Sequence, residues 1–400
     1  MRTRRVWIHA IAFVTLTTAA WAGGKHRFPA EQIPRFNIPK MTTPPTIDGT
    51  IDADEWKQAV RITGMTTAHS IWFRGRPHTF WVAWDAQHIY IAGRAHVLKG
   101  HVLGKSRREK YTTGTVFDDA YEFGLSMEGR NQQPGEAASF FKFILNFLEA
   151  GEYLKMYPSI GQYLYNWRPK MDIANRLYEA DGAQWWEIEL AADLEDLEMP
   201  VENKAGDPIR ILLAHDGKNP GWQWTCVPTA TGYLVHEGFP RGTLTESRPY
   251  VQVEELSGLH DERVDLKSVI HNPSDKPVTV EAVVRIINEQ WRGNADIPPK
   301  VALEQKGERE IPAGGSVRFD VAKEFPGLAY GPTKKDKRSQ MRGAFDFQVR
   351  LKGEEAAPLV YNYHLAFKPD KEKKYLQYTP KDLAFNMQTR YNPVTHKLWI

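Results

Sequence analysis

Residues 45–56 read PTIDGTIDADEW, and their place ahead of four later motifs decides how the chain is interpreted. The stretch combines a tight turn around Gly49 with a run of acidic residues. Asp52, Asp54 and Glu55 offer oxygens to a calcium ion, but the complete D-x-D-x-D-G loop with its closing glutamate is missing. We therefore interpret the acidic run as a solvated turn, with a structural calcium as the alternative.

The later motifs follow the turn in one order along the chain. They are VAWD with IYI at residues 82–91, DAYE at 119–122, WEIELAAD at 186–193 and RGTL at 241–244. Each motif alone is poorly specific. Together they resemble family 9 carbohydrate-binding modules over residues 42–249, although tyrosine replaces a valine at position 121 and aspartate a proline at position 193. The resemblance implies a β-sandwich that binds a sugar and has no catalytic activity.

The pattern of apolar residues independently predicts strands and almost no helices. Residues 79–84 and 88–97 alternate between apolar and polar around a turn at residues 85–87, which is typical of a hairpin with one buried face. Further predicted strands cover residues 121–125, 140–146, 186–190 and 209–214. The economical interpretation is an all-β sandwich.

A second set of strands begins at residue 250, where the tryptophans become rare. Predicted strands cover residues 250–253, 264–270, 278–287, 317–319, 345–351 and 359–367. The set resembles immunoglobulin-like or fibronectin-like modules, without the Cys-Trp-Cys core of true immunoglobulin domains. The predicted fold class is therefore all-β with two β-sandwich domains.

The predicted organisation places a signal peptide at residues 1–22, an extended segment at 23–41, the two sandwiches at 42–249 and 250–368, and a charged segment at 369–400. The last segment ends on Leu398-Trp399-Ile400, so it either pairs back onto the second sandwich or begins an incomplete further unit.

Three arginines precede an apolar run at residues 6–20, and a small-residue site, Ala-Trp-Ala, follows it. We therefore predict cleavage near Ala22 and a secreted or periplasmic protein with no membrane span. Cleavage removes these arginines and no acids, so the net charge of +3 falls by 3 to 0. A neutral chain does not favour nucleic acid as a partner. One cysteine, Cys226, excludes an internal disulfide.

The predicted sugar site departs from the family pattern. The resemblance implies a clamp of two tryptophans, because the C–H faces of a sugar ring pack on indole rings. The first clamp position is Val116 here, and the second falls among Tyr233, Val235 and Phe239. The standard clamp is therefore not carried over.

Other aromatic residues are predicted to replace the clamp. A stretch that we expect to be a loop carries Tyr153, Tyr157, Tyr163, Tyr165 and Trp167, followed by Arg168. Loop aromatics with nearby hydrogen-bond donors suit a stacking surface, although they also suit packing of the loop itself. The predicted ligand contacts are Trp167, Tyr165, Arg168, Trp222 and Trp72. We expect Trp56, Trp81, Trp84, Trp185 and Trp186 to be core residues.

Binding of a polysaccharide or oligosaccharide, without catalysis, is the leading functional hypothesis. Asp118, Asp119 and Glu122 are close in sequence, but nothing sets the separation across a substrate that glycosidases need. The histidine spacing matches no metal motif, so no metal and no cofactor is predicted apart from the alternative calcium. One competing hypothesis is a structural or assembly module that has lost sugar binding. Another is a haem domain of related fold, which would draw its ligands from Met127, Met156, Met171 and His215.

Overall fold

The computed structural model contains two large β-sheets packed against each other. It describes residues 29–67, 72–97, 103–105, 107–127, 140–157, 162–164, 167–169, 171–194, 197, 202–217, 223–230, 233, 236–291, 297–353, 358–368, 391–392 and 397–398. Within these ranges the only helices are 3₁₀ turns of three residues, and no helix is long and apolar enough to cross a membrane. The predicted all-β sandwich fold is confirmed.

The first sheet has 14 strands among the described residues. Its main path runs through β18 (Lys300–Ile311), β17 (Val278–Trp291), β22 (Gln340–Leu351), β23 (Leu359–Phe367), β1 (Arg35–Pro39), β14 (Arg241–Thr245), β12 (Pro208–Gly217), β6 (Ala120–Met127), β7 (Phe140–Asn146), β8 (Gly151–Tyr157) and β9 (Gln162–Leu164). Three short strands pair beside this path: β3 (Thr66–Thr67), β13 (Gln223–Cys226) and β21 (Gly331–Pro332).

The second sheet has 9 strands among the described residues. Its path runs through β10 (Met171–Ala180), β11 (Ala183–Asp193), β5 (His88–Val97), β4 (His78–Trp84), β2 (Val60–Thr63), β15 (Tyr250–Ser257), β16 (Arg263–His271) and β19 (Ser316–Arg318), with β20 (Val321–Glu324) paired to β16. A separate pair joins β24 (Tyr391–Asn392) to β25 (Lys397–Leu398), and the 3₁₀ turns are η1 (Ala30–Gln32), η2 (Trp56–Gln58), η3 (Thr115–Phe117), η4 (His236–Gly238) and η5 (Leu259–Asp261).

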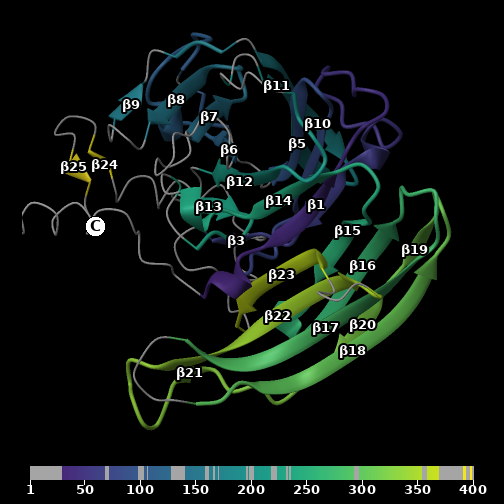
Figure 1. The fold of residues 1–400 in the computed structure, drawn as a ribbon. Helices are drawn as coiled ribbons and strands as arrows, with labels where there is room; N and C mark the ends of the chain where they lie inside the picture. Colours follow the sequence, from purple (N-terminus) through teal and green to yellow (C-terminus); the bar gives the residue numbers. More distant parts are fainter. Residues whose placement is uncertain are drawn as a thin grey trace, which may run out of the picture.

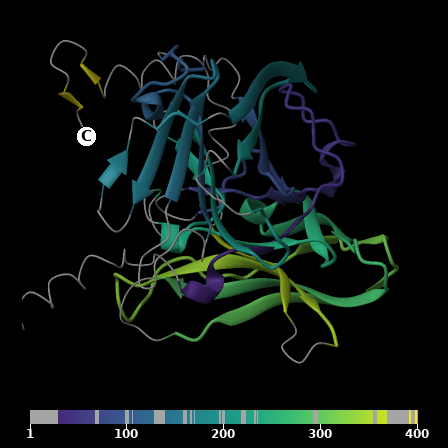
Figure 2. The same cartoon turned by 45° about the horizontal axis from the view of Figure 1, so that its top comes forward.

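Both sheets continue from the first half of the chain into the second. In the first sheet, β1 pairs parallel to β14 and antiparallel to β23. In the second sheet, β15 pairs parallel to β2. Figure 1 shows β1 between the blue and teal strands of the first half and the green and yellow strands of the second half, and Figure 2 shows the two halves stacked. The predicted division of the chain between residues 249 and 250 therefore falls inside two shared sheets, and two separate domains remain a prediction.

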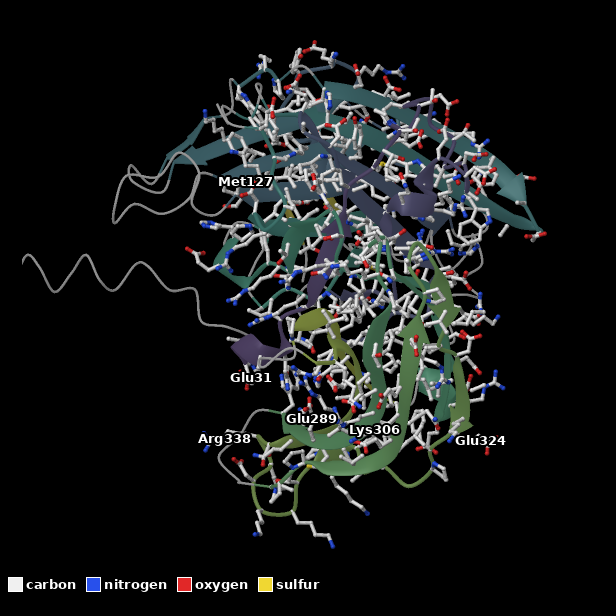
Figure 3. The ribbon with its side chains drawn as sticks, turned by 45° about the vertical axis from the view of Figure 1, so that its right-hand side comes forward. Glu31, Met127, Glu289, Lys306, Glu324 and Arg338 are labelled. Carbon is white, nitrogen blue, oxygen red and sulfur yellow. The ribbon has the colours of Figure 1, made fainter. Side chains whose placement is uncertain are left out.

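A single large hydrophobic core follows the sheets across this junction. Phe80 and Trp186 of the first half belong to the same buried cluster as Ile270 and Phe347 of the second. The alternation of strand residues explains the cluster, because every second side chain of a strand faces the opposite sheet. Figure 3 shows side chains crowded along the length of the molecule, from its upper half to its lower half.

The strands that were predicted best have strict alternation or a continuous apolar run. The structure places strands at residues 88–97, 140–146 and 359–367, as predicted. It also contains two long strands that the pattern did not indicate, β10 and β18, in which almost every residue is partly or fully exposed. Both lie at an edge of their sheet, where one face and one side meet solvent.

The turn at residues 45–56 is held by a buried carboxylate from β11. Oε2 of Glu189 accepts hydrogen bonds from the backbone N–H groups of Gly49, at 2.8 Å, and Asp48, at 3.2 Å. Oε1 of Glu189 accepts a third from Nε1 of Trp56 at 2.7 Å. Burial raises the pKa of Glu189 to about 7, although these hydrogen bonds oppose the shift. Two of the sequence motifs therefore bind each other.

Gly49 is required at this turn by its backbone conformation. Its φ is 86°, and a Cβ atom there would lie 2.8 Å from the carbonyl carbon of Asn175 on β10. Only glycine adopts this conformation without strain and without a clash. The Trp56 side chain that follows is buried, together with Trp81, Trp84 and Trp186, which confirms four of the five predicted core tryptophans. Trp185 is only partly buried, so the prediction was wrong for that residue.

Replacement of Glu189 by alanine should destabilise the whole fold. Three donors, two of them buried, would lose their acceptor, so we expect the free energy of unfolding to fall by about 2–4 kcal/mol. Glu189→Gln keeps one acceptor oxygen and should cost less. Urea denaturation measures the change, with Glu179→Ala, an exposed position on β10, as the control. Equal unfolding midpoints for Glu189→Ala and Glu179→Ala would contradict a role for Glu189 in holding the turn.

Candidate functional site

The structure describes three of the five predicted ligand contacts, while Tyr165 and Trp222 lie outside the described residues. Trp167 is partly buried, and its ring centroid lies 5.2 Å from that of Phe141 and 5.7 Å from that of Phe143. Arg168 is exposed, and its guanidinium lies 5.1 Å from the ring centroid of Tyr111. Trp167 thus packs on the core side of β7, with Arg168 at the surface beside it.

The expectation of a loop between β7 and β11 is wrong for part of the aromatic stretch. Residues 151–157 form β8, which pairs antiparallel to β7. Tyr153 faces the core from this strand and is 2% exposed. The glycine and proline residues that flank the strand suggested a loop, but hydrogen bonding to β7 outweighs that local preference. Tyr153 is therefore a packing residue.

Trp72 lies at the seam between the two halves of the molecule. It packs against Ile33, Ala230 and Ala366, and its ring meets that of Trp291 edge to face with centroids 5.4 Å apart. Nζ of Lys368 lies 5.4 Å from the centroid of the Trp72 ring. The backbone N–H of Phe73, which follows Trp72, donates to the carbonyl oxygen of Ala366 at 2.7 Å. These contacts hold Trp72 between strands that are far apart in sequence.

The two positions that correspond to the family clamp converge on one surface. Val116, in η3, packs against Ala120, Ile144 and Leu154. Tyr233 packs against a cluster on the same surface: Phe140, Leu212, Ala214, Cys226 and Phe239. The strand residues of both clusters point away from the main core, because their chain neighbours belong to that core. We call this surface of β12, β6 and β7 the β6–β7 outer face.

A buried ion pair lies on the β6–β7 outer face. Nζ of Lys142, on β7, contacts Oε2 of Glu122, on β6, and the side chains are 6% and 2% exposed. The same Nζ lies 5.6 Å from the centroid of the Tyr233 ring. Burial is the main reason that the pKa of Tyr233 is raised well above 10, and the nearby Asp216 adds to it. The Lys142–Glu122 pair and the Tyr233 ring therefore lie together on the β6–β7 outer face.

Phe117 is the most exposed large hydrophobic side chain in the part of the chain that the structure describes, at 63%. It is the last residue of η3 and directly follows Val116. The sequence pattern did not single out Phe117, because the family resemblance concerns tryptophans and position 116. The only available signal was an aromatic residue next to a clamp position.

The η3 turn is anchored at both ends, so Phe117 projects from a well-defined backbone. The N–H of Gly114, which has a φ of 79°, donates to Oε2 of Glu152 at 2.8 Å. At the other end, Oδ2 of Asp118 accepts from Nδ2 of Asn146 at 2.8 Å and from the N–H of Arg107 at 2.9 Å. Neighbouring elements therefore hold the turn on both sides of the exposed ring.

The acids that suggested catalysis have structural partners. Asp118 anchors η3, and Oδ2 of Asp119 accepts a hydrogen bond from the N–H of Gly104. Both residues are 1% exposed. Glu122 forms the ion pair with Lys142. These three carboxylates therefore connect loops and strands to one another.

The residues considered for haem lie inside the core where the structure describes their side chains. Met127 and Met171 belong to the main buried cluster. Nδ1 of His215 lies 3.1 Å from Nε2 of His78, and burial lowers the pKa of His78 well below 6.5. Within the described ranges, no group of three or more His, Cys, Asp or Glu side chains is arranged to hold a metal ion.

A second buried charged group lies beside Trp291 on the outer side of the first sheet. The Arg342 guanidinium lies 5.4 Å from the Trp291 ring, and its Nε donates to Oε1 of Glu289 at 2.7 Å. Nε2 of His364 lies 3.5 Å from the same Glu289 oxygen, and its Nδ1 lies 3.5 Å from Oδ1 of Asp346. Glu289 is labelled in Figure 3, on the lower half of the molecule.

The electrostatics of this group favour a charged histidine. Burial lowers the pKa of His364, but hydrogen bonds and attraction to Asp346 and Glu289 outweigh it, so the pKa lies above 6.5. Burial raises the pKa of Glu289, but His364 and Arg342 outweigh it and bring the pKa to about 2. Each charge therefore depends on its neighbours for stabilisation.

No protein-family model and no curated protein matches the chain. Among solved structures, similarity is found to a family 9 carbohydrate-binding module from Caldicellulosiruptor kristjanssonii in complex with cellotriose, with 13% identity, a TM-score of 0.34 and coverage of 54% of this chain and 95% of that one. A protein from Bacteroides uniformis described as carbohydrate-binding has 10% identity, a TM-score of 0.40 and coverage of 52% and 97%.

A β-glucuronidase from Bacteroides uniformis is also similar, with 11% identity and a TM-score of 0.18. The match covers 70% of this chain and 26% of that enzyme. Identities and TM-scores this low assign neither a family nor an activity to the chain.

The stability contributed by His364 should depend on pH. Its pKa is raised in the folded state, so the contribution is fully present below about pH 6.5 and is lost as the pH rises through the raised value. The difference in free energy of unfolding between wild type and His364→Gln should therefore be larger at about pH 5.5 than at about pH 9. Urea denaturation at both pH values measures it. The same difference at both would show that His364 is not charged in the folded protein.

Proposed function

We propose that this protein binds carbohydrate without catalysis, and that Phe117 and the β6–β7 outer face form the contact surface. The carrying observation is the exposed Phe117 ring on an anchored turn that packs through Val116 on the β6–β7 outer face, which also carries the buried Lys142–Glu122 pair. The proposal also uses the resemblance of residues 42–249 to family 9 modules, since both clamp positions of that family fall on this surface.

The chemistry of the surface suits a sugar. The C–H face of a sugar ring packs on an aromatic ring, and the hydroxyl groups around it need donors and acceptors. Phe117 offers the apolar face, while Lys142, Glu122 and Tyr233 carry polar groups on the β6–β7 outer face. Covering the exposed part of one phenylalanine contributes about 1–2 kcal/mol, so one ring supports weak binding and a longer glycan would need further contacts.

Trp167 and Trp72 have a smaller part in this proposal than the sequence suggested. Their rings already pack on Phe141 and Trp291, respectively. Arg168 is exposed beside Tyr111 and is retained as a candidate contact. The proposal places the protein in a secreted or periplasmic location after signal-peptide cleavage, where polysaccharides are encountered.

The replacement Phe117→Ala should weaken glycan binding by about tenfold, because it removes the stacking face and leaves the polar groups in place. Calorimetric titration with cellotriose, followed by a panel of neutral and acidic oligosaccharides, measures the affinity. Val301→Ala is the matched control, because Val301 is 49% exposed and lies on β18 in the other half of the molecule.

Each outcome of this titration has a definite meaning. Unchanged affinity of Phe117→Ala, with binding by the wild type, would place the sugar site elsewhere. Absence of binding by the wild type to every glycan in the panel would overturn the proposed function and favour the structural or assembly role instead.

A further inference from the structure

A pocket of about 390 Å³ lies on the outer side of the first sheet, where β1 joins the two halves of the molecule. Its lining comes from five strands and includes three arginines, Arg35, Arg241 and Arg350. No acidic side chain lines it among the described residues. A pocket with three guanidinium groups and no carboxylate has a strong preference for negative charge.

The sheet register places two of the pocket arginines, Arg35 and Arg241, in line with Arg210, which does not line the pocket. Arg35 on β1 is directly opposite Arg241 on β14, and Arg241 is opposite Arg210 on β12. Neighbouring strands lie about 4.8 Å apart, so three like charges form one row across three strands. Their chain neighbours Phe36 and Ile209 belong to the core, so the row faces outward. Like charges at directly opposed positions destabilise a sheet.

Arg35 has an unmet hydrogen-bonding capacity at this place. Its Nε is buried and has no hydrogen-bond partner among the described residues. No ion pair within those residues joins Arg35 to a carboxylate. Glu31, the nearest acid in sequence, is exposed on η1, which Figure 3 shows at the margin of the molecule. A buried donor without an acceptor destabilises the folded protein, and a bound anion would supply the missing acceptor.

We propose that this pocket binds an oxyanion, either a carboxylate or a sulfate, carried by a small organic molecule such as an acidic sugar. Guanidinium groups bind both anions through paired hydrogen bonds. Pro208 and Leu359 provide apolar walls for the carbon skeleton, and Asn37 and Thr243 provide polar groups for its hydroxyls. The volume is at the small end of the range for ligand sites, which suits one small ligand or the end of a chain.

The pocket and the Phe117 surface are separate sites. The pocket lies beside β1 and β14, whereas Phe117 lies in η3, beside β6, β7 and β8. Failure of the glycan proposal at Phe117 would therefore leave the anion site standing, and the reverse also holds.

The test compares the stabilisation of wild type, Arg35→Gln and Arg309→Gln by three probes. The probes are inorganic sulfate, glucuronate and neutral glucose, each measured by thermal unfolding against sodium chloride of equal ionic strength. Arg309→Gln is the matched control, since it removes the same charge from an exposed position on β18. We expect glucuronate to raise the Tm of wild type and of Arg309→Gln. Its affinity for Arg35→Gln should be lower than for wild type by at least roughly tenfold. Glucose should have no effect.

A second readout separates binding from a structural role. Because Arg35 lies among like charges, Arg35→Gln without ligand should have a Tm at low ionic strength that is equal to or higher than that of wild type. If sulfate and glucuronate both stabilise the protein, the anionic group alone is sufficient for binding. If only glucuronate does so, contacts between the pocket walls and the sugar ring also contribute. Equal stabilisation of Arg35→Gln and Arg309→Gln, or none of wild type, would overturn the proposal.

Discussion

The pairing of one five-residue strand on both edges holds this molecule together. β1 joins β14 on one side and β23 on the other, and without it the first sheet would separate into two parts. The second sheet has only a narrow junction, a single residue pair between β15 and β2. The shared core, the packing of Trp72 at the seam and the arginine pocket all depend on this strand, because each contains residues from both sides of it.

The residues that carry the family resemblance are mainly residues that hold the fold. Glu189 of the WEIELAAD motif binds the backbone of the Ile47-Asp48-Gly49 turn and the indole of Trp56. Glu187 in the same motif pairs with Arg94 and Arg176. Such contacts constrain the strands and the turn whatever the ligand. A resemblance built on them therefore indicates a fold, and the ligand has to be argued from the surface.

Three polar groups lie along the outer side of the first sheet, and two of them pair acids with bases. On the β6–β7 outer face, Lys142 and Glu122 neutralise each other. Around Glu289, two acids are balanced by His364 and Arg342. Only the pocket beside β1 gathers cations without an acid in its lining among the described residues. The lining of this pocket therefore favours a negatively charged ligand.

The sequence by itself determined the all-β class, most of the central strands and the burial of Trp56, Trp84 and Trp186, because alternation within a strand is a local property of the chain. It could not reveal that residues 35–39 join two sheets, since strand pairing depends on partners roughly 200 and 330 residues away. Nor could it reveal that Phe117 is exposed while Trp167 packs on the core. Exposure is decided by what else covers a side chain, and only the tertiary structure brings Glu152, Asn146 and Phe141 to those places.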